Sequence, residues 1–213
     1  MKKKAIVAVV ALVLVLCCAM GGTLAWLVDS TTEVKNTFTY GDINISLWEH
    51  KLNEDGLTLS DDVFTGAKQT GFKMIPGNKI EKDPTVTVEA DSEACWLFVK
   101  VEKSSNFDNF MTYDIDTKWT ELDAVNHPGV YYYNEDELDS LLTKDKEFYV
   151  LKDNKVTVLS EVTKGDFAAF DKDQNGTLSE IEKEALPTLT FTAYAVQKDG
   201  FNTAALAWAE INK

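Results

Sequence analysis

Short stretches of alternating apolar and polar residues recur along most of this chain, and turn-forming residues separate them. Successive side chains of a β-strand point to opposite sides, so this alternation predicts strands with one buried face. Residues 94–102 are typical, because Cys95, Leu97, Val99 and Val101 fall on one side. Similar stretches span residues 34–40, 43–48, 72–75, 85–90, 111–119, 130–133, 148–151, 156–159 and 189–197. The pattern predicts an all-β protein, an antiparallel β-sandwich.

Helical signals are few and lie between or after the strands. Residues 135–142 predict a short surface helix, and residues 203–211 predict a C-terminal helix or an irregular last strand. Residues 52–62 predict a polar loop, and residues 152–155 predict a turn joining two strands.

The N-terminal end has the three parts of a secretory signal. Three lysines precede an uncharged apolar run over residues 5–28, which two glycines interrupt. Small residues before Ala25 predict cleavage between Ala25 and Trp26, so residues 1–25 form the signal peptide and residues 26–213 the mature domain. The alternative is an uncleaved transmembrane anchor, since the run is long enough to span a bilayer.

Charge and cysteine content limit the partners and the disulfides that can be expected for this chain. Its 35 Asp and Glu against 21 Lys and Arg give a net charge of −14. Such a surface repels phosphate backbones, so no nucleic-acid partner is expected, and it suits divalent cations. After cleavage Cys95 is the sole cysteine, so no intramolecular disulfide is expected and Cys95 is interpreted as a small buried hydrophobe.

One segment carries a strong chemical motif. Residues 171–182 read DKDQNGTLSEIE, which fits the EF-hand calcium loop D-x-[DN]-x-[DN]-G-x5-E at every specified position. Ca²⁺ takes six to eight oxygen ligands at about 2.3–2.6 Å. Gly176 permits the sharp turn at position six. The motif predicts a Ca²⁺ site with these ligands: Asp171, Asp173, Asn175, Thr177, Ser179 and Glu182.

The flanks of this loop predict a short helix-loop-helix insertion over residues 163–187, between strands that end at Leu159 and start at Leu189. Phe167 and Phe170 lie one turn apart, and Ile181 and Leu186 are expected to pack against them. A single loop predicts a structural extracellular site with an affinity on the order of 10⁻⁴–10⁻³ M.

No catalytic motif is recognisable in the sequence. His50 and His127 are isolated from one another and fit no zinc-ligand spacing, so both are interpreted as surface or loop histidines. Tyr131, Tyr132 and Tyr133 could form a sugar-stacking patch. Strand alternation instead predicts Tyr131 and Tyr133 on one face and Tyr132 on the other.

Three segments together resemble the TasA/camelysin family of exported Gram-positive proteins, whose precursors use a dedicated signal peptidase of the SipW type. They are residues 21–49, 74–102 and 189–208. The resemblance implies a jelly-roll β-sandwich. It also implies a role in the biofilm matrix, where subunits assemble into fibres as the mature N-terminal segment inserts into the sheet of a neighbour. Trp26–Tyr40 could lie extended in that way, although the same segment could equally pair within its own domain.

These observations favour a secreted structural protein of the cell surface or extracellular matrix that polymerises by strand addition and binds one Ca²⁺. Its expected partners are other copies of itself, matrix components and, during export, the signal peptidase, with the membrane contacted only through the uncleaved signal segment. The alternatives are a secreted camelysin-like metallopeptidase, since the resemblance extends to camelysin-type members described as metallopeptidases, and a monomeric Ca²⁺-dependent adhesion module. The sequence offers no residue set to assign peptidase activity.

Overall fold

The computed structural model describes residues 28–31, 43–64, 66, 68–173 and 178–211. The predicted signal peptide, its cleavage site between Ala25 and Trp26, and the predicted strand over residues 34–40 lie outside these residues. No helix in the described part of the chain is long and apolar enough to cross a bilayer.

The described chain folds mainly into β-strands that pair antiparallel. The strands are β1 (Val28–Thr31), β2 (Ile45–Leu52), β3 (Leu59–Phe64), β4 (Lys79–Glu81), β5 (Thr85–Val88), β6 (Cys95–Lys103), β7 (Met111–Ile115), β8 (Trp119–Asp123), β9 (His127–Tyr133), β10 (Lys146–Tyr149), β11 (Leu151–Val158) and β12 (Leu189–Gln197). Short 3₁₀ turns, η1 (Phe107–Asn109) and η2 (Asp136–Leu138), and the helices α2 (Lys164–Ala168), α3 (Glu180–Lys183) and α4 (Ala204–Ile211) lie between or after them.

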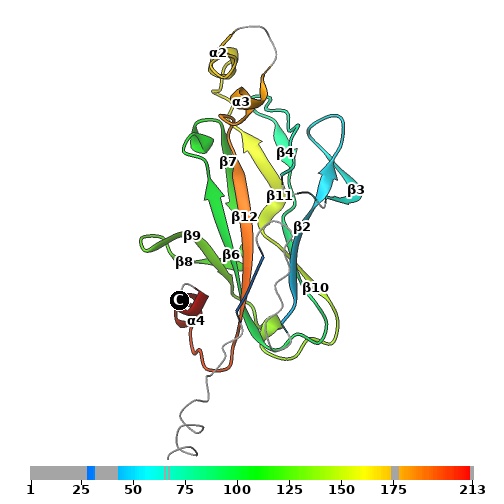
Figure 1. Cartoon of the computed structure of the whole chain (residues 1–213), viewed down its shortest axis with the longest axis vertical. Helices are drawn as coiled ribbons and strands as arrows, with labels where there is room; N and C mark the ends of the chain where they lie inside the picture. The colour runs from blue at the N-terminus through cyan, green and yellow to red at the C-terminus, as the bar shows by residue number, and fades with distance from the viewer. Residues whose placement is uncertain (1–27, 32–42, 65, 67, 174–177, 212–213) are drawn as a thin grey trace, which may run out of the picture.

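The strands form three sheets (Figure 1). The first has five strands in the order β1-β12-β6-β9-β8, the second four in the order β10-β5-β2-β3, and the third three in the order β4-β11-β7. Strand β2 of the second sheet contacts both β12 and β1 of the first. The all-β, sandwich-like fold is therefore confirmed, while the jelly-roll connectivity stays a prediction.

The main core lies between the sheets and follows the period-two pattern of the sequence. Cys95, Leu97, Val99 and Val101 of β6 are all buried in it, as their alternation predicts. They pack with residues of the second sheet, such as Val86 and Val88, and of the third, such as Leu151 and Val156. Burial of apolar area on this scale is the main source of stability for such a fold.

The opposite face of the five-stranded sheet is covered by α4. Trp208 of this helix packs on Phe98 of β6 and on Tyr194 of β12, with ring centroids 5.2 Å apart in each case. The helical alternative for residues 203–211 is thus the correct one. Tyr132 lies on this side, whereas Tyr131 and Tyr133 lie on the core side, as the alternation predicts.

Several sequence predictions of local structure are wrong. Residues 72–75 form no strand, and residues 52–62, predicted as a loop, contain the start of β3. Residues 111–119 split into β7 and β8, because a turn interrupts them at Asp116. Of the helix predicted over residues 135–142, only the 3₁₀ turn η2 forms.

The predicted turn over residues 152–155 is a bulge within β11. Asp153 and Asn154 adopt φ angles of 57° and 52°, a left-handed conformation that asparagine and aspartate tolerate better than most residues. The pairing of β11 with β7 shifts register between Leu151 and Val156. The same polar residues that signal a turn therefore bend a continuous strand.

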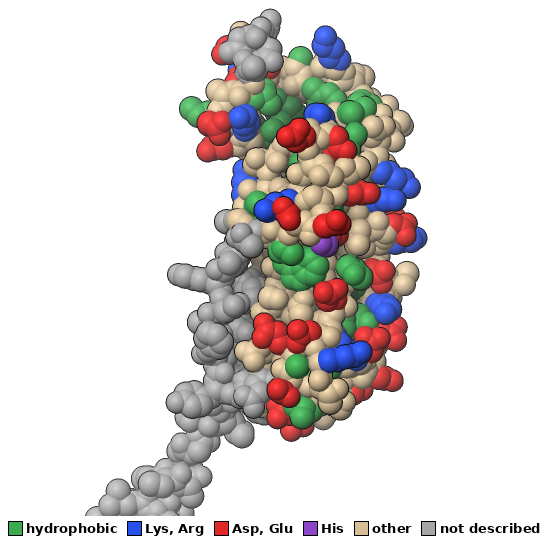
Figure 2. All heavy atoms as spheres, turned by 90° about the vertical axis from the view of Figure 1, so that its right-hand side faces the viewer, with side chains coloured by type: hydrophobic (Ala, Val, Ile, Leu, Met, Phe, Trp, Pro, Cys, Tyr) green, Lys and Arg blue, Asp and Glu red, His purple; other side chains and the backbone are tan. Residues whose placement is uncertain are grey.

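Charged side chains cover much of the surface. Figure 2 shows acidic side chains spread over the whole length of one face, with lysines between them. Their distribution agrees with the net charge of −14.

Candidate metal centre

The candidate metal centre lies between β11 and β12, where the chain leaves the sheets and forms α2 and α3 at one end of the molecule (Figure 1). Both helices are short, with five and four residues. Helices of this length are not stable by propensity alone, so their ends must be held by specific bonds.

A capping box begins each helix. Thr163 caps α2, and its hydroxyl and the carboxylate of Asp166 bond reciprocally to backbone N–H groups. Ser179 caps α3 in the same way with Glu182. Each box satisfies N–H groups that the first turn of a helix leaves without an intrahelical partner.

Three carboxylates of the predicted loop converge. Ligand atoms of Asp171, Asp173 and Glu182 all lie within 4.8 Å of one another, and this is the sole group of three or more His, Cys, Asp or Glu side chains of that kind among the described residues. Hard oxygen donors of this charge suit a hard divalent cation such as Ca²⁺. The donor set therefore fits a metal ion.

Glu182 is firmly held by hydrogen bonds. It is only 6% exposed, and its carboxylate accepts several hydrogen bonds. Oε1 accepts from the backbone N–H of Lys172 at 2.7 Å, and Oε2 accepts from the N–H and the hydroxyl of Ser179 at 2.9 and 2.7 Å. Hydrogen bonds from the Ser179 side chain, then from backbone N–H groups, lower the pKa of Glu182 to about 2.

These bonds limit how Glu182 can hold a cation. Each carboxylate oxygen offers about two acceptor directions. The two bonds from Ser179 occupy both directions of Oε2, and the backbone N–H groups of Lys172 and Asp173 also bond to this carboxylate. Chelation by both oxygens therefore requires the Ser179 hydroxyl to leave Oε2, which also frees that hydroxyl to face the ion.

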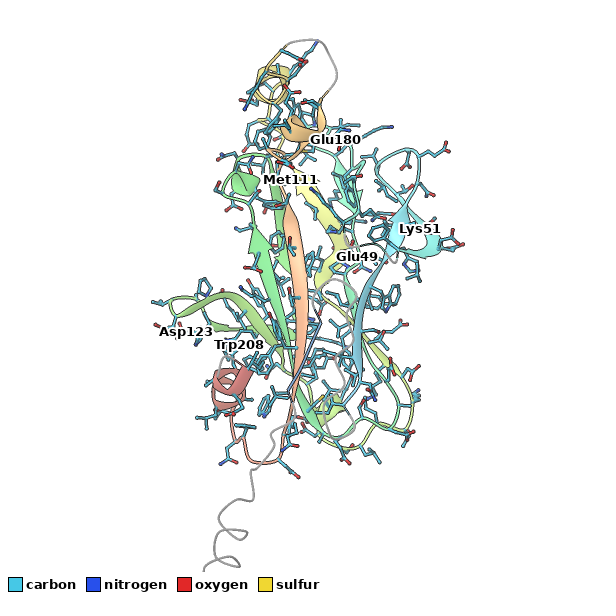
Figure 3. The ribbon with its side chains drawn as sticks, viewed as in Figure 1. Glu49, Lys51, Met111, Asp123, Glu180 and Trp208 are labelled. Carbon is cyan, nitrogen blue, oxygen red and sulfur yellow. The ribbon has the colours of Figure 1, made fainter. Side chains whose placement is uncertain are left out.

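A small aromatic cluster anchors the loop to the sheets. Phe110, the residue between η1 and β7, packs on Phe167 and Phe170 with ring centroids 5.8 and 5.2 Å apart. Figure 3 shows Met111 at this end of the sheet, just below Glu180 of α3. Leu186 joins the cluster as predicted, but Ile181 does not: it is 78% exposed, because the short helix α3 turns it away from the aromatic rings.

The structure brings together part of the predicted ligand set. Asp171, Asp173 and Glu182 form the cluster, and Ser179 contacts Glu182. Asn175 and Thr177 lie outside the described residues. The sequence analysis missed the N–H of Lys172 as a partner of Glu182 and Phe110 as the anchor, and only the spacing of the motif hinted at the first.

The two histidines lie elsewhere. Nδ1 of His50 is 2.6 Å from Oδ2 of Asp83, which is buried, and the backbone N–H of His50 donates to Oδ1. His127 is exposed and contacts Trp208, with ring centroids 6.4 Å apart. His50 of β2 is therefore half-buried and paired with Asp83 in the connection between β4 and β5, rather than a simple surface histidine.

The fold and the site define a class: an all-β protein with a carboxylate cluster, suited to a divalent cation, in a short helix-loop-helix at one end. Comparisons of the chain with protein-family models, with curated proteins and with solved structures found no match.

Proposed function

We propose that this chain is an exported structural protein of the TasA/camelysin type, which builds fibres at the cell surface or in the extracellular matrix of a Gram-positive bacterium. Each copy gives its leading strand to the next copy and binds one structural Ca²⁺ in the loop over residues 171–182. The single observation that carries the proposal is the position of β1.

β1 lies at an edge of the five-stranded sheet, three residues after the expected cleavage site. It pairs only with β12 within that sheet, from Val28 opposite Val196 to Thr31 opposite Ala193. A short edge strand near a chain end can leave its own sheet at low cost, and the same segment of another copy can occupy the same register. In the monomer β1 then pairs with β12 of its own domain, and in a fibre it pairs with β12 of the next copy.

Such an exchange makes an open assembly. If the leading strand of each copy lies on β12 of the next, the donor and acceptor surfaces differ, and a contact of that type propagates into filaments unless the rotation closes a ring. The backbone hydrogen bonds of β12 are satisfied in either arrangement. The acidic surface keeps free monomers soluble until they meet.

A disulfide that ties β1 to β12 of its own sheet tests whether β1 is exchanged between copies. Ser30 lies opposite Tyr194, so Ser30→Cys with Tyr194→Cys should allow a disulfide that holds β1 on its own sheet. Electron microscopy of purified Trp26–Lys213 should show filaments for the wild type and for Tyr194→Cys alone. The oxidised double variant should form no filaments, and reduction of its disulfide should restore them. Deletion of Trp26–Thr39 should also abolish them.

Two results would contradict the proposal. Filaments of the oxidised double variant would show that β1 is not exchanged. Wild-type protein that stays monomeric with and without Ca²⁺ would leave the fibre role without support and favour the adhesion module.

A further inference from the structure

The third sheet leaves one edge unpaired next to a cavity. β7 is an outer strand of that sheet, and no described strand pairs with its other edge. A solvent-open cavity of about 310 Å³ is lined by Thr112, Tyr113, Asp114 and Ile115 of β7, and by Lys103, Asp108 and Tyr131. The strand edge and the cavity thus coincide.

The lining shows how the cavity lies along β7. Successive side chains of a strand point to opposite faces, so a cavity on one face would contact every second residue. This cavity contacts four consecutive residues and therefore follows the edge of the strand. Its other wall comes from the end of β6, from η1 and from β9. The shape is a groove beside a row of backbone N–H and C=O groups.

The charges of the groove favour a basic occupant. Lys103 is paired with Asp108 at 2.7 Å, which leaves exposed Asp114 to set the net sign of the lining. Burial raises the pKa of Tyr113, and Tyr131, Asp108 and Glu121 raise it further. Of these neighbours, Glu121 adds a further negative charge near the groove. A second copy of this acidic chain would meet repulsion here, whereas lysine or arginine would be attracted.

β7 also lacks the usual protection of an exposed edge. The edge strands β4 and β10 each begin with a lysine, Lys79 and Lys146, a residue that discourages strand pairing. β7 reads MTYDI, with neither lysine nor proline, and its one charged residue is Asp114. We propose that the groove along β7 binds an extended peptide of a partner protein that carries lysine or arginine and pairs with β7 as an added strand.

Binding of synthetic peptides to the full-length chain, purified in mild detergent because of its apolar residues 5–28, tests the proposal. The probe is a short labelled peptide that alternates valine and threonine with lysine. Fluorescence anisotropy should show binding that weakens as salt rises. Asp114→Lys should weaken binding about fivefold or more, since it replaces attraction by repulsion across the strand pair. Asp61→Lys, the same change on the exposed edge strand β3, should leave it unchanged.

Two control peptides distinguish the contribution of charge to binding from the contribution of strand pairing. A peptide with glutamate in place of lysine should bind weakly, and a lysine peptide with methylated backbone nitrogens should lose binding, since it cannot pair with an edge. Hydrogen exchange should slow at residues 111–115 when the lysine peptide is bound.

Several outcomes would overturn this inference. They are equal binding of the methylated peptide, protection at β12 instead of β7, an equal loss in Asp61→Lys, and an absence of peptide binding. Binding of a neutral oligosaccharide in the groove, blocked by Tyr131→Ala, together with no binding of the lysine peptide, would replace the peptide by a glycan. None of these results bears on strand exchange at β1.

Discussion

The five-stranded sheet and the helix-loop-helix over residues 163–187, which carries the candidate metal centre, are held together by different forces. β12 and β6 pair over nine residues, from Leu189 opposite Lys103 to Gln197 opposite Cys95, and carry fully buried apolar side chains on both faces of the sheet. In the loop, α2 buries no residue and α3 buries only Glu182. The loop is held instead by two capping boxes and the aromatic contact with Phe110. Water competes for the polar bonds but not for the buried area, so the loop should be the less stable region and the one that a cation stabilises.

The largest loss of stability should come from a substitution that leaves a cavity beside the sheet. Phe98 is fully buried under Trp208, so Phe98→Ala should lower the free energy of unfolding by about 3–5 kcal/mol. Ile181→Ala, on the exposed side of α3, should change it by less than about 0.5 kcal/mol. Urea unfolding followed by tryptophan fluorescence measures both, and similar losses in the two variants would refute the contrast between the regions.

Calcium should stabilise the protein through the loop. With a dissociation constant on the order of 10⁻⁴–10⁻³ M, about 10 mM Ca²⁺ should add roughly 1.4–2.7 kcal/mol to the free energy of unfolding. Calorimetry should detect binding to the wild type and none to Asp171→Ala or Glu182→Ala. Asp171→Ala is the cleaner variant, because Glu182 also caps α3. Absence of wild-type binding at millimolar Ca²⁺ would disprove the calcium site.

Acid should weaken the loop before it affects the sheet. The pKa of Glu182 in the metal-free fold is lowered from 4.5 to about 2, so its ionised form favours the folded loop. This contribution is complete above about pH 4.5 and is lost as the pH falls toward 2. NMR titration of the Glu182 carboxylate should give a midpoint well below that of an unstructured peptide. A normal midpoint would mean that the bonds from Ser179 and Lys172 do not persist in solution.

The smallest effect should come from a cap remote from the ion. Thr163→Ala removes the hydroxyl that starts α2 and leaves all predicted ligands in place. A cap contributes about 1 kcal/mol, so Ca²⁺ affinity should fall by roughly tenfold or less. Thr163→Ser keeps the hydroxyl and should bind like the wild type. A complete loss of binding in Thr163→Ala would mean that α2 positions Asp171 far more directly than its contacts indicate.

The same contrast explains which features the sequence could reveal. The faces of β6 and β9 follow from alternation alone, and the converging carboxylates follow from the spacing of one motif, because both depend on neighbours along the chain. The bulge in β11 depends on its pairing with β7, and η2 buries Leu138 in a core built from strands that are distant in sequence. The predicted packing of Ile181 on the aromatic cluster is wrong because the motif specifies positions in the loop but not the length of the helix that follows.

Because Cys95 is buried, the reactivity of its thiol can report on the opening of the five-stranded sheet. Desolvation raises the pKa of its thiol to about 12, so in the folded sheet it is both enclosed and protonated near neutral pH. Alkylating reagents, which attack the thiolate, should reach it only when β6 separates from its neighbours. The labelling rate of this thiol would therefore measure how often the five-stranded sheet opens. If the proposed fibres form, the same measurement on fibres and on monomers would show whether assembly slows that opening.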